Sequence, residues 1–476
     1  MLKKIFRFAT VITVATVAVM TSITAQSVSA QEKSATVTVS SLNNLQTDIS
    51  KVAALIDPNF PILVQMALAQ GTNFGLDMTK PIALYGIPAE AEMGLVTFVP
   101  LKSPKMFEAQ MANLRESGTI PESVQIEVKG DYVVITNGTT WDADVPEITA
   151  DGLIHLNTKP GELSPILEKV AALTQGENGE KIQAVQKEWA QIDNFDLTLN
   201  ITEDGSIKVD TVVTPKADTE IGKLYVACEK LTKSTLGPLC DAEAPMSGQF
   251  LSVIGQYEKM AENLSAREDI PEEIRDVILK ALQVEKFDSA FSFYSDDKGI
   301  YGIYAMGISN SAEISATLVK ALEDGKVNGK ANADKIGKSI TIHEIELEGA
   351  NLALGFHPKY LFVTISANGS DPVNLMKKMF KERTPKVGKV AQNGTISFDM
   401  SLLAPYFPQV SDLTGKFTSL AKFENGTYIT NWTIESALIL SAGKIYATYK
   451  NAAGEEDGNL GEDEDVDVDE LFGDEE

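Results

Sequence analysis

The second half of the chain repeats the order and spacing of motifs that occur in the first half. Gly222-Lys223-Leu224-Tyr225 recurs as Gly443-Lys444-Ile445-Tyr446. A turn signal lies seventeen residues before each of these motifs, Asp204-Gly205 in the first half and Asn425-Gly426 in the second. Equal spacing of this kind predicts an internal duplication, in which one supersecondary unit occurs twice.

Expected strands also correspond between the halves. The matched stretches are residues 151–156 with 393–398, residues 131–136 with 359–364, residues 93–101 with 299–308, and the alternating apolar runs that open at Phe195 and Phe417. A helix-like stretch follows each member of the first pair. Alternation of apolar and polar residues indicates half-buried strands, and the Asp-Gly and Asn-Gly signals are typical of β-hairpins.

Four amphipathic helices are predicted from apolar residues spaced three and four apart. Ser103 and Pro104 supply the N-cap and first residue of one helix, and Asn310 begins another with Glu313 in the capping-box position. The four apolar faces are Leu42, Leu45, Ile49 and Val52; Phe107, Met111 and Leu114; Phe250, Ile254, Tyr257 and Met260; and Ile314, Leu318 and Leu322.

These patterns predict an α+β fold made of two tandem pseudo-repeats of mainly antiparallel sheet covered by helices. The chain is also too long for a single core. We expect a signal peptide at 1–30, the first repeat at 31–238, the second repeat at 239–450, and a disordered acidic tail at 451–476. Two such repeats side by side would leave a groove between them.

The first thirty residues have the order of a cleavable secretory signal. Lys3, Lys4 and Arg7 precede an apolar stretch from 8 to 23, and Val28-Ser29-Ala30 places small residues before a cleavage point after Ala30. A membrane anchor is disfavoured because threonines interrupt the short apolar stretch. No cysteine stands at the cleavage point for lipid attachment. The mature chain is therefore expected to be soluble and either periplasmic or extracellular.

The net charge of the full chain is −26. Removal of 1–30 takes away three positive charges, and residues 455–476 hold thirteen acidic residues without a lysine or arginine. This charge argues against nucleic acid and against anionic lipid surfaces as partners, and leaves cations or a basic partner as options at the tail. The tail does not match a calcium loop, because Val468 and Asp474 stand where glycine and glutamate are needed. Its composition predicts disorder.

The two cysteines of the chain are Cys228 and Cys240, and an exported protein meets an oxidising environment. A disulfide between them is the favoured expectation, because Gly237-Pro238 could turn the chain between them. Such a bridge stabilises by roughly 3 kcal/mol in the chain-entropy model. It would act as a clasp at the junction of the repeats. The alternative is two unpaired buried thiols.

No catalytic, cofactor-binding or metal-binding residue is assigned. The three histidines are His155, His343 and His357, and His343-Glu344 fails the zinc-protease pattern because Leu347 occupies the place of the second histidine. No nucleophile elbow, phosphate-binding loop or dinucleotide fingerprint occurs. The histidines are expected to be structural or at the surface, and no cofactor is expected.

One loop, residues 75–81, carries turn chemistry. Gly75 can end a helix, Asp77 can accept hydrogen bonds from nearby backbone N–H groups, and Pro81 can begin a strand. This loop, the strand that follows, Val99-Pro100-Leu101, a helix and residues 130–134 together resemble the organisation of uncharacterised secreted proteins of planctomycete-type bacteria. The resemblance covers about a quarter of the chain. It implies an export signal and a duplicated α+β body, and no activity.

The leading hypothesis for function is an exported, soluble, non-catalytic protein with a structural or ligand-binding role. A second hypothesis is a carrier of an apolar ligand or lipid in a cavity of the α+β body, and the residues that could line it are Met66, Met93, Met106, Phe107 and Met111. A third is a hydrolase with two paired carboxylates, which needs both in one cleft with opposed pKa environments. The sequence leaves the ligand, the oligomeric state and the role of the tail open.

The cleavage signal makes a direct prediction. Protein recovered from outside the cytoplasm is expected to begin at Gln31, because signal peptidase cuts after small residues at −3 and −1. Intact-mass measurement and N-terminal sequencing test this. A mature chain that retains residues 1–30 would contradict it.

Overall fold

The computed structural model describes residues 33–57, 60–62, 65, 74–89, 92–116, 123–163, 186–253, 275, 279, 284, 286–347, 349–410 and 412–456. The predicted signal peptide with its cleavage point after Ala30, and the acidic tail beyond residue 456, lie outside the described residues.

More of the described chain lies in strands than in helices. The strands are β1 (Ala35–Val39), β2 (Ile82–Ala89), β3 (Glu92–Pro100), β4 (Val124–Lys129), β5 (Tyr132–Asn137), β6 (Ile154–Thr158), β7 (Ile192–Ile201), β8 (Ile207–Pro215), β9 (Lys233–Ser234), β10 (Met246–Val253), β11 (Lys286–Asp296), β12 (Gly299–Gly307), β13 (Gly329–Ile336), β14 (Ile340–Leu347), β15 (Ala350–His357), β16 (Tyr360–Ser366), β17 (Gly388–Lys389), β18 (Gly394–Asp399), β19 (Lys416–Glu424) and β20 (Thr427–Ile434).

The helices lie between strands or after β20. They are α2 (Leu42–Ile56), α4 (Pro104–Glu116), α7 (Glu220–Glu229), α10 (Ser311–Glu323), α11 (Pro372–Glu382) and α12 (Ser436–Glu456), with 3-10 turns η2 (Pro160–Leu163), η3 (Gly237–Leu239) and η4 (Met400–Tyr406). The mixture is α+β, as the sequence predicts.

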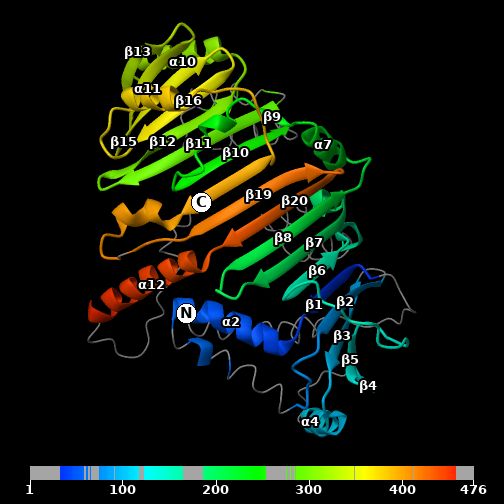
Figure 1. Ribbon diagram of the computed structural model, residues 1–476. Helices are drawn as coiled ribbons and strands as arrows, with labels where there is room; N and C mark the ends of the chain where they lie inside the picture. Colours follow the sequence, from blue (N-terminus) through cyan, green and yellow to red (C-terminus); the bar gives the residue numbers. More distant parts are fainter. Residues whose placement is uncertain are drawn as a thin grey trace.

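Eighteen of the described strands form one sheet, and every pairing between them within it is antiparallel. From edge to edge the pairings give the order β4-β5-β3-β2-β1-β6-β7-β8-β20-β19-β18-β10-β11-β12-β16-β15-β14-β13 (Figure 1). The strands β9 and β17 form a separate pair. The strands before residue 216 and those after residue 245 meet where β8 pairs with β20.

Helices α10 and α11 cover opposite faces of the same end of the sheet. Ile314 and Leu318 of α10 pack with Phe356, whereas Met376 of α11 packs with Ala353 three positions earlier on the same strand. Residues an odd number apart on a strand face opposite sides, so the two helices lie on different faces. Burial of each large apolar side chain there contributes about 1.5–3 kcal/mol.

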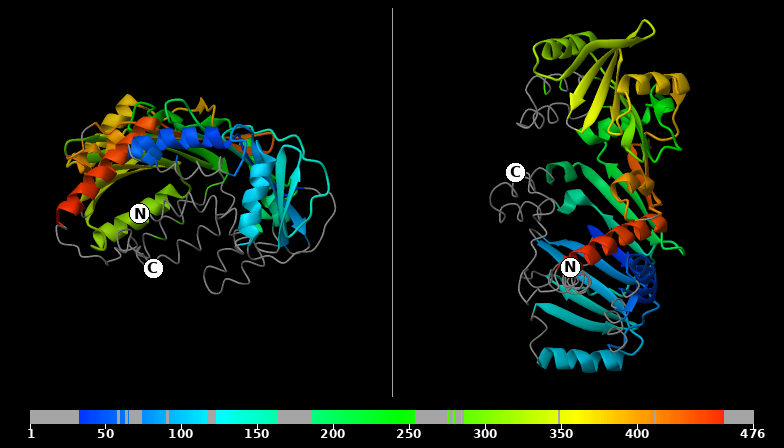
Figure 2. Two further views of the ribbon diagram at one scale, coloured as in Figure 1. Left: turned by 90° about the horizontal axis from the view of Figure 1, so that it is seen from below. Right: turned by 90° about the vertical axis from the view of Figure 1, so that its left-hand side faces the viewer.

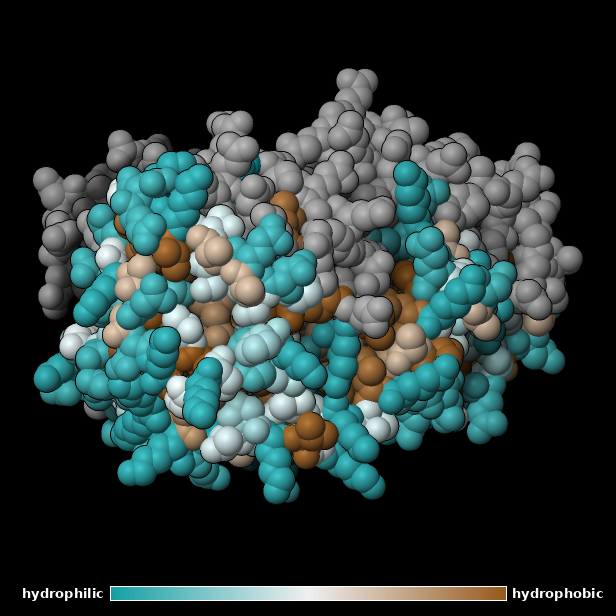
Figure 3. All heavy atoms as spheres, turned by 90° about the horizontal axis from the view of Figure 1, so that it is seen from above, coloured by the Kyte–Doolittle hydropathy of each residue, from teal (hydrophilic) through white to brown (hydrophobic). Residues whose placement is uncertain are grey.

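The sheet is curved, and the described helices lie along both of its sides (Figure 2). When the strand pairings are followed across the sheet, the side chains on the side of α10 correspond to those on the side of α4 at the other end, where Phe107 of α4 packs on Val133. Seen from above, hydrophilic side chains cover most of the described surface, and hydrophobic ones form several small groups among them (Figure 3). We call the side that bears α4 and α10 the α10 face.

Most predicted elements are confirmed, with three differences. Phe250, expected to begin a helix, lies in β10, because it pairs with both β11 and β18; the rest of that predicted helix, from residue 254, lies outside the described residues. Asn310 precedes α10 as expected, but it adopts φ 54° and its side chain makes no cap hydrogen bond. Helix α12 extends to Glu456, into the predicted tail, since alanine and glutamate favour helix there.

The predicted disulfide between Cys228 and Cys240 is wrong, and both thiols are free. The sulfur of Cys228 accepts a hydrogen bond from the backbone N–H of Val253 at 3.3 Å. Cys240 instead lies by Ser247. These two partners lie six residues apart on β10, which is about 20 Å of strand. The turn at Gly237 forms η3 and carries Cys240 away from α7 rather than back toward it.

Thiol titration tests this correction. Protein purified without a reducing agent and then unfolded is expected to titrate two thiols, and its intact mass should not change on reduction. Labelling of the folded protein should be slow, because burial raises the pKa of both thiols and so reduces the reactive thiolate. An intact mass that increases by two hydrogens on reduction would contradict this correction and show that the disulfide is present.

Candidate functional site

A hollow of about 640 Å³ lies at the middle of the α10 face. It spans the β8–β20 junction, with β7 and β8 on one side and β20, β19, β18 and β10 on the other. We call it the central chamber. Its lining residues come from these six strands, from the residue just before β18 and from α7: Phe195, Leu197, Val209, Thr211, Tyr225, Phe250, Leu251, Ser252, Asn393, Gly394, Thr395, Ile396, Ser419, Ala421, Phe423, Tyr428, Thr430 and Trp432.

The chamber is hollow because small residues meet at its floor. Gly394 pairs directly with Ala421 in the β18–β19 ladder. A methyl group built on Gly394 would lie 3.3 Å from the Cβ of Ala421 and 3.6 Å from the ring of Phe250. Ser419 lies opposite Trp432 on the next strand. Large aromatic side chains therefore surround a floor with little side-chain volume.

Helix α7 closes one side of the chamber with an aromatic cluster. The ring of Tyr225 packs against Phe423 at 5.1 Å and against Tyr428 at 5.9 Å, and the last two lie 5.0 Å apart. Burial raises the pKa of Tyr225 to about 12 and also raises that of Tyr428. Within the described residues, neither phenol makes a hydrogen bond. The cluster thus presents apolar ring surface and two neutral hydroxyl groups.

Two polar residues fix α7 to the sheet. The carboxylate of Glu229 accepts hydrogen bonds from the backbone N–H groups of Asn425 and Gly426, both at 3.1 Å, in the β19–β20 turn. The amide nitrogen of Asn393 donates to the carbonyls of Cys228 and Leu231, and its oxygen accepts from the N–H of Phe423. The helix from the first half is therefore held on strands of the second half.

The methionines proposed from sequence as cavity lining do not line the chamber. Met66 lies outside the described residues, and nothing is described of the Met93 side chain. Met106 is exposed, while Phe107 and Met111 pack in the α4 cluster. Sequence reasoning missed the chamber residues, although aromatic residues at alternate positions of β20 were a usable signal.

His343 and Ser315 form a pair that resembles a hydrolase dyad in distance alone. The Ser315 Oγ lies 2.8 Å from the His343 Nε2. The Nδ1, however, accepts a hydrogen bond from the backbone N–H of Asn332 at 3.0 Å. In the neutral ring the proton must then lie on Nε2, which donates to the serine and cannot accept its proton. The pair is structural in this arrangement.

The other two histidines lie away from the chamber. His155 lies on the sheet face opposite the chamber, where its Nε2 is 2.9 Å from Asp196 Oδ2. The same carboxylate oxygen also accepts a hydrogen bond from the side-chain amide of Asn157. His357 Nδ1 accepts from the backbone N–H of Lys359 in a turn. Within the described ranges, no group of three or more His, Cys, Asp or Glu side chains could hold a metal ion.

The loop at 75–81 has the expected turn chemistry. Asp77 accepts from the backbone N–H and the hydroxyl of Thr79, and these bonds hold the pKa of Asp77 below its ordinary value. Gly75 has φ 73°, and a methyl group there would lie 2.7 Å from the carbonyl oxygen of Ser103. Close backbone approach therefore accounts for the glycine.

No protein-family model, curated protein or solved structure matches the chain. The resemblance to secreted proteins of planctomycete-type bacteria therefore stays a prediction. In the part of the chain that the structure describes, no helix is both long and apolar enough to cross a membrane.

His343 makes stability depend on pH. Its side chain is fully buried, and desolvation lowers its pKa below the ordinary 6.5. The unfolded state therefore binds the proton more readily than the folded state. The contribution of His343 to the free energy of unfolding is complete above about pH 6.5 and decreases as the pH falls below that value. The melting temperature is expected to decrease between pH 7 and pH 5.

The variant His343→Asn isolates this contribution. The asparagine oxygen can accept from the Asn332 N–H in place of Nδ1, but it does not titrate. We expect a lower melting temperature at pH 7 and a shallower decrease toward pH 5 than in the unmodified protein. An unchanged slope in the variant would remove His343 as the cause.

Proposed function

We propose that this protein is an exported, non-catalytic binding protein that holds an apolar ligand, such as a lipid acyl chain, in the central chamber. The observation that carries the proposal is an open hollow of about 640 Å³ whose lining is mainly apolar and aromatic. Ligand pockets commonly measure about 300–1,000 Å³ and have this composition. An apolar chain entering the hollow would bury both its own surface and that of the lining.

Polar groups at the side of the chamber suit the end of such a ligand. The phenols of Tyr225 and Tyr428 are available as donors, because neither bonds to another described residue. A phenol is protonated at neutral pH, and burial raises the pKa of both further. Two neutral donors fit a carboxylate or ester oxygen. Residues with a polar tip and an apolar body serve both parts of an amphiphile.

We propose that the two halves of the chain arose by duplication, and the position of the chamber at their junction is consistent with this origin. Both halves have the same strand order, β4-β5-β3-β2-β1-β6-β7-β8 and β15-β16-β12-β11-β10-β18-β19-β20. The offset that relates Gly222 to Gly443 also relates Asp210 to Asn431, and these two lie opposite each other in the β8–β20 pair. A two-fold axis through this point would produce that register. The hairpin β13–β14 and helix α11 are additions in the second half.

Under this proposal the repeats extend over 31–238 and 239–450, and the chamber straddles their junction. Export rests on the signal-like residues 1–30, with cleavage after Ala30. A ligand carrier outside the cytoplasm needs no cofactor.

Filling the chamber tests the function. The variant Ala421→Phe places a ring over the floor, and binding of the fluorescent fatty acid cis-parinaric acid is expected to weaken at least tenfold, which is about 1.4 kcal/mol. The matched control is Leu420→Phe, because Leu420 is the neighbouring residue on the opposite face and is exposed. That control should bind as the unmodified protein does.

A second measurement locates the ligand. A brominated fatty acid should quench the fluorescence of Trp432, and the quenching should decrease in Trp432→Phe. Native mass spectrometry of gently purified protein should show a co-purifying lipid. Equal fatty-acid binding by Ala421→Phe and Leu420→Phe, or no binding by the unmodified protein, would exclude the chamber as a lipid site.

A further inference from the structure

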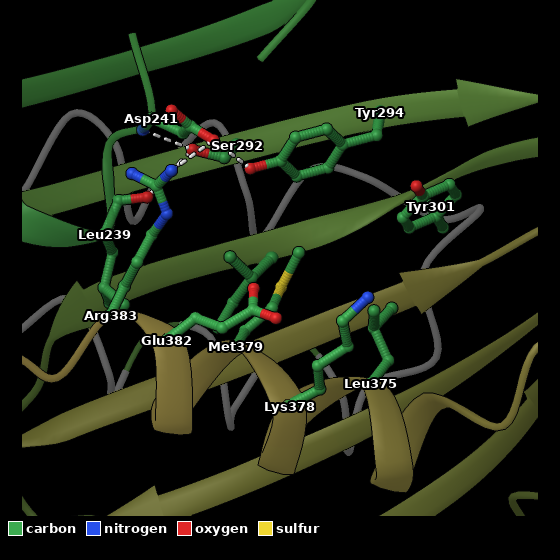
Figure 4. A pocket seen from close by; sticks show the side chains of 11 residues that line it. Leu239, Asp241, Ser292, Tyr294, Tyr301, Leu375, Lys378, Met379, Glu382 and Arg383 are labelled. Carbon is green, nitrogen blue, oxygen red and sulfur yellow. Dashed lines mark hydrogen bonds and ion pairs between the residues drawn. The ribbon is translucent and has the colours of Figure 1, made fainter. Parts of the chain in front are cut away.

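A second cavity, of about 190 Å³, lies on the opposite face of the sheet from the central chamber. Helix α11 forms one wall, β11 and β12 form the floor, and the segment after η3 closes one end (Figure 4). Its volume equals roughly six water molecules at about 30 Å³ each. It can therefore hold one compact molecule and is too small for a lipid chain.

One end of this cavity is a built polar cluster. The carboxylate of Asp241 accepts from the hydroxyl of Tyr294 at 2.6 Å, pairs with Arg383 at 2.5 Å, and accepts from the backbone N–H of Glu243. The hydroxyl of Ser292, which is buried, accepts from the Asp241 N–H. The Asp241 side chain is only 10% exposed. These contacts hold the polar groups in place without a ligand.

The other polar groups of the cavity are unused. Lys378 and Glu382 lie one turn apart on α11, and neither makes an ion pair or hydrogen bond with a described residue. In Figure 4 both side chains extend from the helix toward the strands, on the side where Tyr294 and Tyr301 lie. With Asp241 and Arg383, the lining holds two carboxylates and two cations, so its charge is balanced.

The remaining lining is apolar and aromatic. Ile303, Leu375 and Met379 form an apolar surface. The rings of Tyr294 and Tyr301 stack at 5.6 Å with an interplanar angle of 21°. An apolar floor beside stacked rings favours a ligand with a C–H face. A charge-balanced rim favours a neutral ligand with groups that both donate and accept hydrogen bonds over a simple anion or cation.

We propose that this cavity binds a single neutral sugar unit. Ring C–H groups would lie on Met379 and the tyrosines, while hydroxyl groups would donate to Glu382 and accept from Lys378. The bonds are charge-assisted and so stronger than those between neutral groups. This site is independent of the central chamber, because the sheet separates the two.

The Asp241 carboxyl does not fit the acid of a paired-carboxylate hydrolase. A paired-carboxylate hydrolase needs one carboxyl with a raised pKa to act as an acid. Burial alone would raise the pKa of Asp241, but hydrogen bonds from Tyr294 and Glu243, with the Arg383 charge, hold it below its ordinary value. Asp241 therefore stays ionised, and both of its carboxylate oxygens already have partners within the protein.

The test uses the full mature chain and a panel of small probes. The sugar probes are the methyl glycosides of glucose, galactose, mannose and N-acetylglucosamine; sodium benzoate and tetramethylammonium chloride are the charged probes. Saturation-transfer NMR and calorimetry measure binding. We expect at least one glycoside to bind, and Lys378→Gln and Glu382→Gln each to weaken it about fivefold or more.

Matched controls separate this site from folding and from the chamber. Lys381→Gln lies on the same helix outside the cavity and should change sugar binding less than twofold, as should Ala421→Phe. Circular dichroism melts should be equal for the exposed lysine and glutamate variants. Loss of fatty-acid binding without loss of sugar binding in Ala421→Phe would show the two sites to be separate.

Two results would overturn the proposal. One is the absence of binding by every glycoside in the panel. The other is binding of benzoate or tetramethylammonium that depends on only one of Lys378 and Glu382, which would mark a site for a single ion.

Discussion

The antiparallel pairing of β8 with β20 is the interaction on which the rest of the molecule depends. It joins β8, near the middle of the described chain, to β20, close to its end, and makes one sheet out of two sets of strands. Its register runs from Ile207 opposite Ile434 to Val213 opposite Tyr428. Side chains on β7, β8, β19 and β20 share a face only because of this register, since a slip of one residue would move each to the other side.

The central chamber follows from this junction together with a choice of small residues. Gly394 and Ala421 leave space, and Tyr225 reaches over from α7 to wall it. Asn393 and Glu229 hold that helix at the chamber through backbone groups of neighbouring segments. The same few contacts therefore position the chamber wall and connect the halves.

Local structure was predictable where local chemistry decides it. The turns at Gly205 and Gly426 adopt positive φ, as their Asp-Gly and Asn-Gly signals indicate. Phe250 was assigned wrongly, because its spacing suits a helix while its actual partners on β11 and β18 lie far along the chain. The repeated motifs predicted related halves, but motif matching alone does not say which strands become neighbours.

The candidate sites were harder to predict for the same reason. Trp432 and Val209 become neighbours through a pairing between distant segments. Asp241 meets Arg383 through the packing of α11 on β16, β15 and β12. Conversely, Cys228 and Cys240 are close in sequence, but the structure holds their sulfurs at different points along β10. Proximity in sequence is therefore a poor guide to spatial contact here.

The capping of the β19–β20 turn by Glu229 has a consequence for how the chain could be divided. A fragment that ends after α7 would carry a helix whose binding surface belongs to the missing part. It would also expose the edge of β8, where seven residues pair with β20 in the intact chain. The complementary fragment would expose β20 and the uncovered ring of Phe423. Each fragment alone would expose a strand edge and apolar surface that favour association, and the matching register would make it specific for the other fragment. The two fragments therefore have the properties of a split protein that reassembles when both are present.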